Sequence, residues 1–181
     1  WLNEVRAIVA NYRPTGGGVT TPPNNLFANR ITIAGPGTVT GSNVGATAEP
    51  GQPLIVYPTS TNAVWWRFTP SQAGILTIDT CGSNFDTLMA VFTGPAVNAL
   101  SGVASNDDSC GLQSRVTFAA TANVEHQIAV VGYQNDTGSI TLNLAFSPTT
   151  SATVTALSAP TSGAVGEVLA FGAAVAPADP A

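Results

Sequence analysis

Hydrophobic and polar residues alternate with a period of two along most of this chain. The pattern is clearest in four short runs rich in β-branched residues, at positions 74–80 (GILTIDT), 114–119 (SRVTFA), 127–133 (QIAVVGY) and 138–144 (GSITLNL). Gly, Asn, Asp or Pro interrupts the chain around each run, as is typical of turns between strands. The pattern therefore predicts strands at these four places.

Weaker runs predict further strands. They lie at positions 38–42, 63–68, 87–92 and 102–105. The middle of the chain shows no helical period. Many short strands separated by turns are typical of a sandwich or barrel, so the predicted fold class is all-β.

Proline-rich and threonine-rich stretches divide the chain into three parts. Residues 14–25 read as a turn, a short strand and a linker, and residues 147–151 (SPTTS) read as a second linker. The predicted organisation is a central domain at 24–147, flanked by residues 1–23 and 148–181.

Both flanking parts carry strand patterns of their own. Residues 3–10 and 19–21 predict two strands before the central domain, and residues 152–157 and 167–175 predict two after it. An isolated two-stranded hairpin is marginal in water and has edges that attract other strands. We expect these segments to mediate assembly through strands that contain Val5, Ala7, Val9, Val154, Val168 and Phe171.

The first segment also fits a different element. Its apolar residues fall on one face of an amphipathic helix, namely Leu2, Val5, Ile8, Val9 and Tyr12. The glycine-rich turn and the threonine-rich run that follow favour strands. Both interpretations stay open.

Charge is scarce. Only 8% of the 181 residues are charged, against roughly 25% in average domains, and the net charge is -5 with five basic residues. No basic stripe is present to neutralise a phosphate backbone, so nucleic acid is not an expected partner. No apolar run reaches the roughly 20 residues of a membrane span, and no signal peptide opens the chain, which reads as a mature protein or a fragment.

The two cysteines, Cys81 and Cys110, each stand beside a glycine in a polar, turn-like stretch. A disulfide between them is the natural interpretation, and two buried thiols are the alternative. A bridge of this loop length would stabilise the fold by roughly 3 to 4 kcal/mol and would persist only in an oxidising compartment. The expected location is therefore extracellular, either secreted or at the cell surface.

Trp65 and Trp66 are adjacent in a predicted strand and must point to opposite faces of it. One is expected in the core. The other either packs beneath a loop or forms a platform on which a sugar stacks. A glycan contact at Trp65 or Trp66 is the sharper hypothesis, and plain packing is the simpler one.

Acidic residues cluster in two predicted loops. Asn106, Asp107 and Asp108 form one group, and the proposed disulfide would bring Asp86 or Asp79 close to them. Hard carboxylate and amide oxygens on loops suit Ca²⁺, and the sequence contains no complete EF-hand pattern. Calcium is thus the candidate ligand, although the sequence requires no cofactor. The alternative role is the capping of backbone amides in Asx turns.

Catalytic groups are few. The single histidine, His126, lies inside a strand-like run, with no thiolate or serine elbow near it in sequence. A pair of glycosidase carboxylates drawn from Asp79, Asp86, Asp107 and Asp108 is the remaining enzymatic alternative. We expect a protein that is not an enzyme.

Two kinds of glycosylation site are candidates. Asn135 begins the one N-x-S/T triplet of the chain, in a predicted surface turn. The linkers offer O-linked sites at Thr21, Thr149 and Thr150, and a simple linker role is the alternative.

The central part resembles the bacterial pre-peptidase C-terminal-like domains, which are jelly-roll β-sandwiches of secreted and cell-surface proteins. Five motifs carry the resemblance, at positions 25–29 (NLFAN), 41–51 (GSNVGATAEPG), 64–68 (VWWRF), 78–88 (IDTCGSNFDTL) and 104–108 (ASNDD). The resemblance implies a jelly-roll-type antiparallel sandwich without catalytic function. Residues 53–58 depart from it, because members often have a polar loop there.

The flanking parts resemble pieces of an immunoglobulin-like or cadherin-like repeat. Residues 152–181 are similar to its first two strands and residues 3–22 to its last two. That order suggests either one period of a tandem array or a subunit whose ends complete each other between molecules. The expected function is a repeat or subunit of an extracellular bacterial filament, assembled head to tail with copies of itself. The alternative is a carbohydrate-binding or cell-wall-binding module of a secreted hydrolase.

Overall fold

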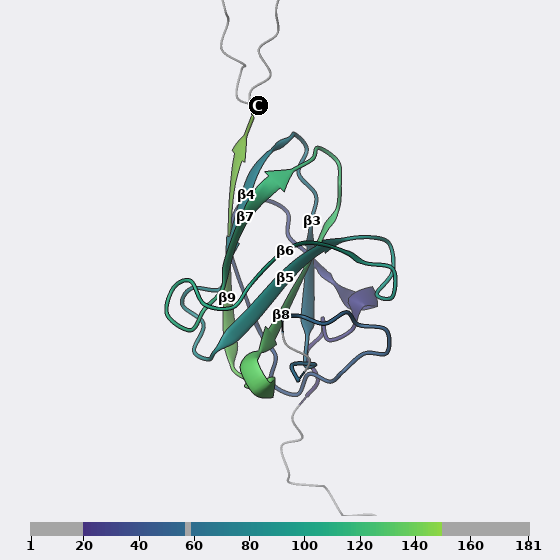
Figure 1. The fold of residues 1–181 in the computed structure, drawn as a ribbon, viewed down its shortest axis with the longest axis vertical. Coiled ribbons are helices and arrows are strands. Elements are labelled where there is room, and N and C mark those ends of the chain that lie inside the picture. The colour runs from purple at the N-terminus through teal and green to yellow at the C-terminus, as the bar shows by residue number, and fades with distance from the viewer. Residues whose placement is uncertain (1–19, 57–58, 150–181) are drawn as a thin grey trace, which may run out of the picture.

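The computed structural model describes residues 20–56 and 59–149 of the chain. The described part is a sandwich of two β-sheets with two single-turn 3-10 helices (Figure 1). The elements follow one another as η1 (Phe27–Asn29), β1 (Ile31–Thr32), β2 (Gly37–Ser42), β3 (Val64–Phe68), β4 (Gly74–Asp79), β5 (Thr87–Thr93), β6 (Ser101–Asn106), β7 (Arg115–Ala120), β8 (His126–Gly132), η2 (Tyr133–Asn135) and β9 (Ser139–Pro148).

The all-β sandwich predicted from the sequence is confirmed. One sheet has five strands in the order β1-β3-β8-β5-β6, and the other has four in the order β2-β9-β4-β7. Neighbouring strands are antiparallel except for the short β1, which pairs with β3 in parallel. All eight runs singled out in the central part form strands, and the sequence pattern missed the two-residue β1 and the 3-10 turns. It also placed the second linker too early, because β9 continues through Ser147 and Pro148, which pair with β4.

The main core lies between the two sheets. Alternate residues of β3, β5 and β8 point into it, and Leu76, Ile78, Leu142 and Leu144 meet them from the four-stranded sheet. Packing there is close at Gly41 of β2, where an added Cβ would lie 2.7 Å from the Trp66 ring. Only glycine therefore fits beneath this tryptophan.

A second apolar cluster covers the outer face of the five-stranded sheet. The remaining alternate residues of β3, β5 and β8 form it, together with Phe27 of η1 and Ile55 from the long segment between β2 and β3. Because both faces of the central strands are covered, β8 is buried at every position. The continuous apolar runs in the sequence reflect this two-sided burial.

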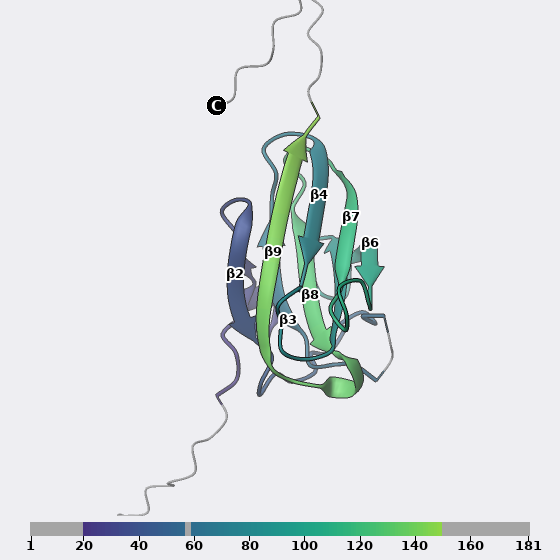
Figure 2. The same cartoon turned by 90° about the vertical axis from the view of Figure 1, so that its left-hand side faces the viewer.

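The chain enters and leaves the sandwich at opposite ends (Figures 1 and 2). At the entry, the amide of Trp65 at the start of β3 donates a hydrogen bond to the carbonyl of Asn24, at 2.9 Å. At the exit, the amide of Thr149 donates to the carbonyl of Ala73, also at 2.9 Å. The ten residues of β9, at about 3.3 Å each, cover most of the distance between the two ends.

Several sequence predictions fall outside the described residues. These are three of the four flanking strands, Val19 of the fourth, the alternative helix near the start, Thr150, and the six expected assembly residues Val5, Ala7, Val9, Val154, Val168 and Phe171. Thr20 and Thr21 of the fourth predicted strand are described and lie in no strand, so that prediction is wrong for these two residues. Within the described part, no helix is long and apolar enough to span a bilayer.

Candidate functional site: an acidic loop cluster beside the disulfide

Three loops meet at the entry end of the sandwich. These are the loops that follow β4, β6 and β8. They meet because the antiparallel register places the ends of these three strands beside the starts of β5 and β7. Gly132 pairs with Thr87, and Asn106 pairs with Met89. Residues that are distant in sequence are thereby gathered in one place.

The predicted disulfide is confirmed. Cys81, just after β4, bonds to Cys110, in the loop before β7, with their Cα atoms 5.9 Å apart. The bridge links a loop of the four-stranded sheet to the segment that leaves the five-stranded sheet. It therefore fastens two of the three loops to each other.

A buried hydroxyl network holds the same loops beneath the disulfide. Thr80 and Thr87 share a hydrogen bond of 2.6 Å between their hydroxyls. The Ser114 hydroxyl lies 2.6 Å from the carbonyl oxygen of Thr87 and 2.8 Å from that of Asp107. All three side chains are fully buried. The sequence analysis missed this network, because a threonine or serine at a strand end gives no sign of its partner.

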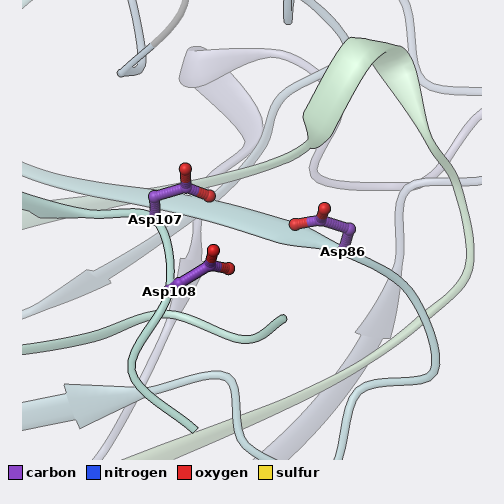
Figure 3. Close-up of side chains that lie close together, drawn as sticks. All are labelled: Asp86, Asp107 and Asp108. Carbon is purple, nitrogen blue, oxygen red and sulfur yellow. The ribbon is translucent and has the colours of Figure 1, made fainter. Parts of the chain in front are cut away.

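Asp86, Asp107 and Asp108 come together above this network. One carboxylate oxygen from each lies within 4.8 Å of the other two. Figure 3 shows Asp86 extending toward the two neighbouring aspartates from the opposite side. Of the residues predicted to form a calcium site, the structure brings Asp86, Asp107 and Asp108 together, and a bound ion stays a prediction.

No described basic residue neutralises the cluster. The three arginines of the described part are engaged elsewhere: Arg115 with Asp79, and both Arg30 and Arg67 with Glu125. Burial raises the pKa of the Asp86 carboxyl above its ordinary value, and the negative charges of its acidic neighbours raise it further. One oxygen of Asp86 is buried without a hydrogen-bond partner among the described residues.

These features fit a hard cation. A buried carboxylate oxygen that lacks a donor loses its hydration without compensation, and two further carboxylates face it across the loops. Ca²⁺ accepts several carboxylate oxygens from flexible loops. A proton shared within the cluster would relieve the same repulsion at low pH.

Two other acidic-region residues have structural roles. Asn106 accepts a hydrogen bond from the backbone amide of Arg115 with its side-chain oxygen, at 2.8 Å. Asp79 accepts from the amide of Cys81, at 3.1 Å, and from the side chain of Asn143, at 2.7 Å. For these two residues the backbone-capping interpretation describes their contacts.

The predicted glycan contact at Trp65 and Trp66 is wrong. Both indole side chains have no exposed surface, so neither can stack on a sugar. Trp66 lies in the core between the sheets, and Trp65 packs edge-on against Phe27 at 5.3 Å in the outer cluster. Ile55, which follows β2 and precedes β3 along the chain, belongs to the same cluster as Trp65.

His126 is a strand residue, as expected. It begins β8, is 3% exposed, and lies against the ring of Phe118 at 5.2 Å between centroids. The adjacent Glu125 is paired with arginines rather than with the imidazole. None of these contacts provides a nucleophile.

The candidate glycosylation sites within the described part are exposed. Asn135, Thr21 and Thr149 all lie at the surface. The side-chain nitrogen of Asn135 donates a hydrogen bond to the carbonyl of Thr59 at 2.7 Å, and the hydroxyl of Thr149 donates to that of Ala73 at 3.0 Å. Glycosylation at these positions stays a prediction.

No family model matches this chain, and no curated protein does. Two solved structures are similar to it. The pre-peptidase C-terminal domain of a collagenase from Bacillus anthracis is 14% identical, with a TM-score of 0.44, and the match covers 64% of this chain and 94% of that domain. A periplasmic inhibitor of g-type lysozyme from Aeromonas hydrophila is 12% identical, with a TM-score of 0.44, and the match covers 65% of this chain and 96% of that protein. The first bears the name of the family that the sequence motifs resemble, and likenesses this distant assign no role to this chain.

Proposed function

We propose that this chain is a non-enzymatic structural module of an extracellular filament or fibrous surface protein, joined head to tail to further copies. The observation that carries the proposal is the path of the chain, which enters the disulfide-closed sandwich at one end and leaves at the other. A module of this kind can be connected to one neighbour at each end of its long axis. The disulfide supports an oxidising, extracellular setting.

The joints between modules are proposed to form by β-strand complementation. Residues 3–22 and 152–175 have the period-two pattern of strands and resemble parts of an immunoglobulin-like repeat. Main-chain hydrogen bonds supply affinity when a strand is added to a sheet. A contact between two different surfaces repeats head to tail and grows an open filament unless it closes into a ring.

Electron microscopy of the purified full-length chain tests this proposal. We expect filaments whose axial repeat matches one sandwich plus one joint. Phe171→Asp, within a predicted strand, should abolish them by placing a charge inside the joint. Ala159→Asp, in the predicted turn between the two C-terminal strands, is the matched control and should leave filaments intact.

The proposal fails if the protein stays monomeric at every concentration and residues 150–181 remain sensitive to protease in excess protein. It also fails if Phe171→Asp assembles as the natural sequence does. Density that runs unbroken between units would identify a tandem array, and interrupted density would identify strand exchange.

We further propose that Asp86, Asp107 and Asp108 bind one Ca²⁺ ion at the entry end. Their convergence and the unpartnered buried oxygen of Asp86 support this site. The ion would offset the mutual repulsion of the carboxylates and would stiffen the loop end from which the chain enters.

Thermal unfolding with and without calcium tests the metal site. We expect Ca²⁺ to raise the melting temperature of the natural sequence and to have no such effect on Asp86→Asn. In EDTA, Asp86→Asn should be at least as stable as the natural sequence, because a neutral amide removes the repulsion. Asp136→Asn, another acidic loop residue at the same end, is the control and should keep the response. Equal responses of the natural sequence and Asp86→Asn would contradict the site.

A further inference from the structure

The four edges of the two sheets differ in how they are protected against pairing with another strand. Charged residues, bulges and shortness are the usual protections. β1 has only two residues, β6 carries a register shift opposite Val91 and Phe92, and β7 begins with the charged Arg115. β2 has six residues and contains no charge, proline or bulge. It is the one unprotected edge of the described sandwich.

No strand of the described part pairs with the outer backbone of β2. The amide of Asn43 donates to the carbonyl of Gly138 at 3.3 Å, which fixes the alternation of the ladder with β9. Residues Gly37, Val39 and Gly41 therefore face β9, while the amides and carbonyls of Thr38, Thr40 and Ser42 point away from it. Among the described residues, none makes a hydrogen bond to these outward backbone groups.

A shallow groove borders the second half of this edge. Thr40, Gly41 and Ser42 line one part of it, residues 20–24 of the entry segment line another, and Ile31 and Val44 contribute apolar surface. These two aliphatic side chains are 38% and 41% exposed. Figure 2 shows β2 at the rim of the sandwich, with β9 on one side only. A strand laid along β2 would thus find backbone partners and apolar contacts together.

We propose that the β2 edge pairs with the β2 edge of a second copy, antiparallel and about a two-fold axis. Self-pairing sets a strand against its own sequence, so any charged residue near the axis would face a like charge. β2 has none, and its exposed Thr38 and Thr40 would instead form threonine pairs, which are favourable across strands. The contact is isologous and closed, and it joins two four-stranded sheets into one continuous sheet.

This lateral contact is separate from the head-to-tail joint proposed above and does not rest on it. The pairing would set two filaments side by side, or two single molecules where no filament forms. Its strength comes from the outward amides of Thr38, Thr40 and Ser42. The occupant that competes with a second copy is residues 1–19 of the same chain, which precede the groove residue Thr20.

Hydrogen exchange of the full-length protein over a range of concentrations tests the proposal, with sedimentation to measure association. We expect protection of the Thr38, Thr40 and Ser42 amides to rise with concentration. Thr40→Lys should lose this rise and weaken pairing at least tenfold, because it sets two like charges on the same face close to the two-fold axis, at an exposed position that the fold tolerates. Ser105→Lys on the β6 edge is the matched control and should change neither quantity.

Three results would overturn the inference. Protection that is full at every dilution would mean that the molecule's own chain covers β2. Fast exchange at every concentration would mean that nothing pairs there. Loss of association in Ser105→Lys rather than in Thr40→Lys would place the contact at β6. Failure of filaments to form in the microscope leaves all three readouts intact, so the two proposals are tested separately.

Discussion

At the scale of single residues, Trp65 and Trp66 illustrate how alternation and burial are decided separately. Adjacent strand positions necessarily point to opposite faces, and the two indoles do so. Whether the second face is open to solvent depends on what covers it. Ile55 and Phe27, from other segments of the chain, cover Trp65. The face that could have bound a sugar is therefore part of a second apolar cluster.

His126 gives the stability of the protein a predicted pH dependence. Burial lowers the pKa of this imidazole below 6.5, and the backbone hydrogen bond with Val124 offsets only part of that effect. The unfolded chain therefore binds a proton at a higher pH than the folded chain does. The stability of the neutral, buried form is complete above pH 6.5 and is lost as the pH falls toward the folded pKa.

We expect the free energy of unfolding to fall between pH 7.5 and 5.5, with a slope of up to about 1.4 kcal/mol per pH unit. Chemical denaturation at several pH values measures it. His126→Phe should flatten this dependence, because the chain has no other histidine. The neighbouring Glu125 does not titrate in this window: burial opposes its ionisation, but hydrogen bonds and the two arginines hold its pKa below the ordinary value. An unchanged slope in His126→Phe would contradict the assignment.

At the scale of elements, the loop end is organised by the hydroxyls of Thr80, Thr87 and Ser114 rather than by the disulfide alone. Ser114 begins the approach to β7 and touches both the start of β5 and the segment after β6. Its backbone amide also donates to the Thr80 hydroxyl at 2.9 Å. One small residue thus joins three segments through its hydroxyl and its backbone amide.

Ser114→Ala is expected to destabilise the protein by about 1 to 3 kcal/mol, because the single hydroxyl proton is lost and a buried carbonyl oxygen is left without a donor. Denaturant unfolding measures the change. Thr117→Ala, which removes an exposed hydroxyl pair with Thr77, is the control and should stay within about 0.5 kcal/mol of the natural sequence. Equal effects of the two substitutions would show that the buried network adds nothing beyond an ordinary surface contact.

At the scale of the whole molecule, the two ends of the described sandwich differ in charge as well as in which end of the chain they carry. The aspartates that lack an ion pair with described residues gather at the entry end, whereas the Arg30, Arg67 and Glu125 group lies beside the first residues of β8, away from it. An end-to-end contact between copies would therefore be asymmetric in charge. This asymmetry suits a head-to-tail arrangement and makes the acidic end sensitive to cations and salt.

The sequence by itself determined the class of fold and the places of eight strands, because period-two patterning and turn residues act locally. It also indicated a bridge between Cys81 and Cys110, with two free thiols as the alternative, and the structure contains the bridge. Only the tertiary structure decided what lies beside what. The cover over Trp65, the Ser114 network, the meeting of Asp86 with Asp107 and Asp108, and the open edge of β2 all depend on contacts between distant segments. Strand order and loop packing set such contacts, and no local pattern encodes them.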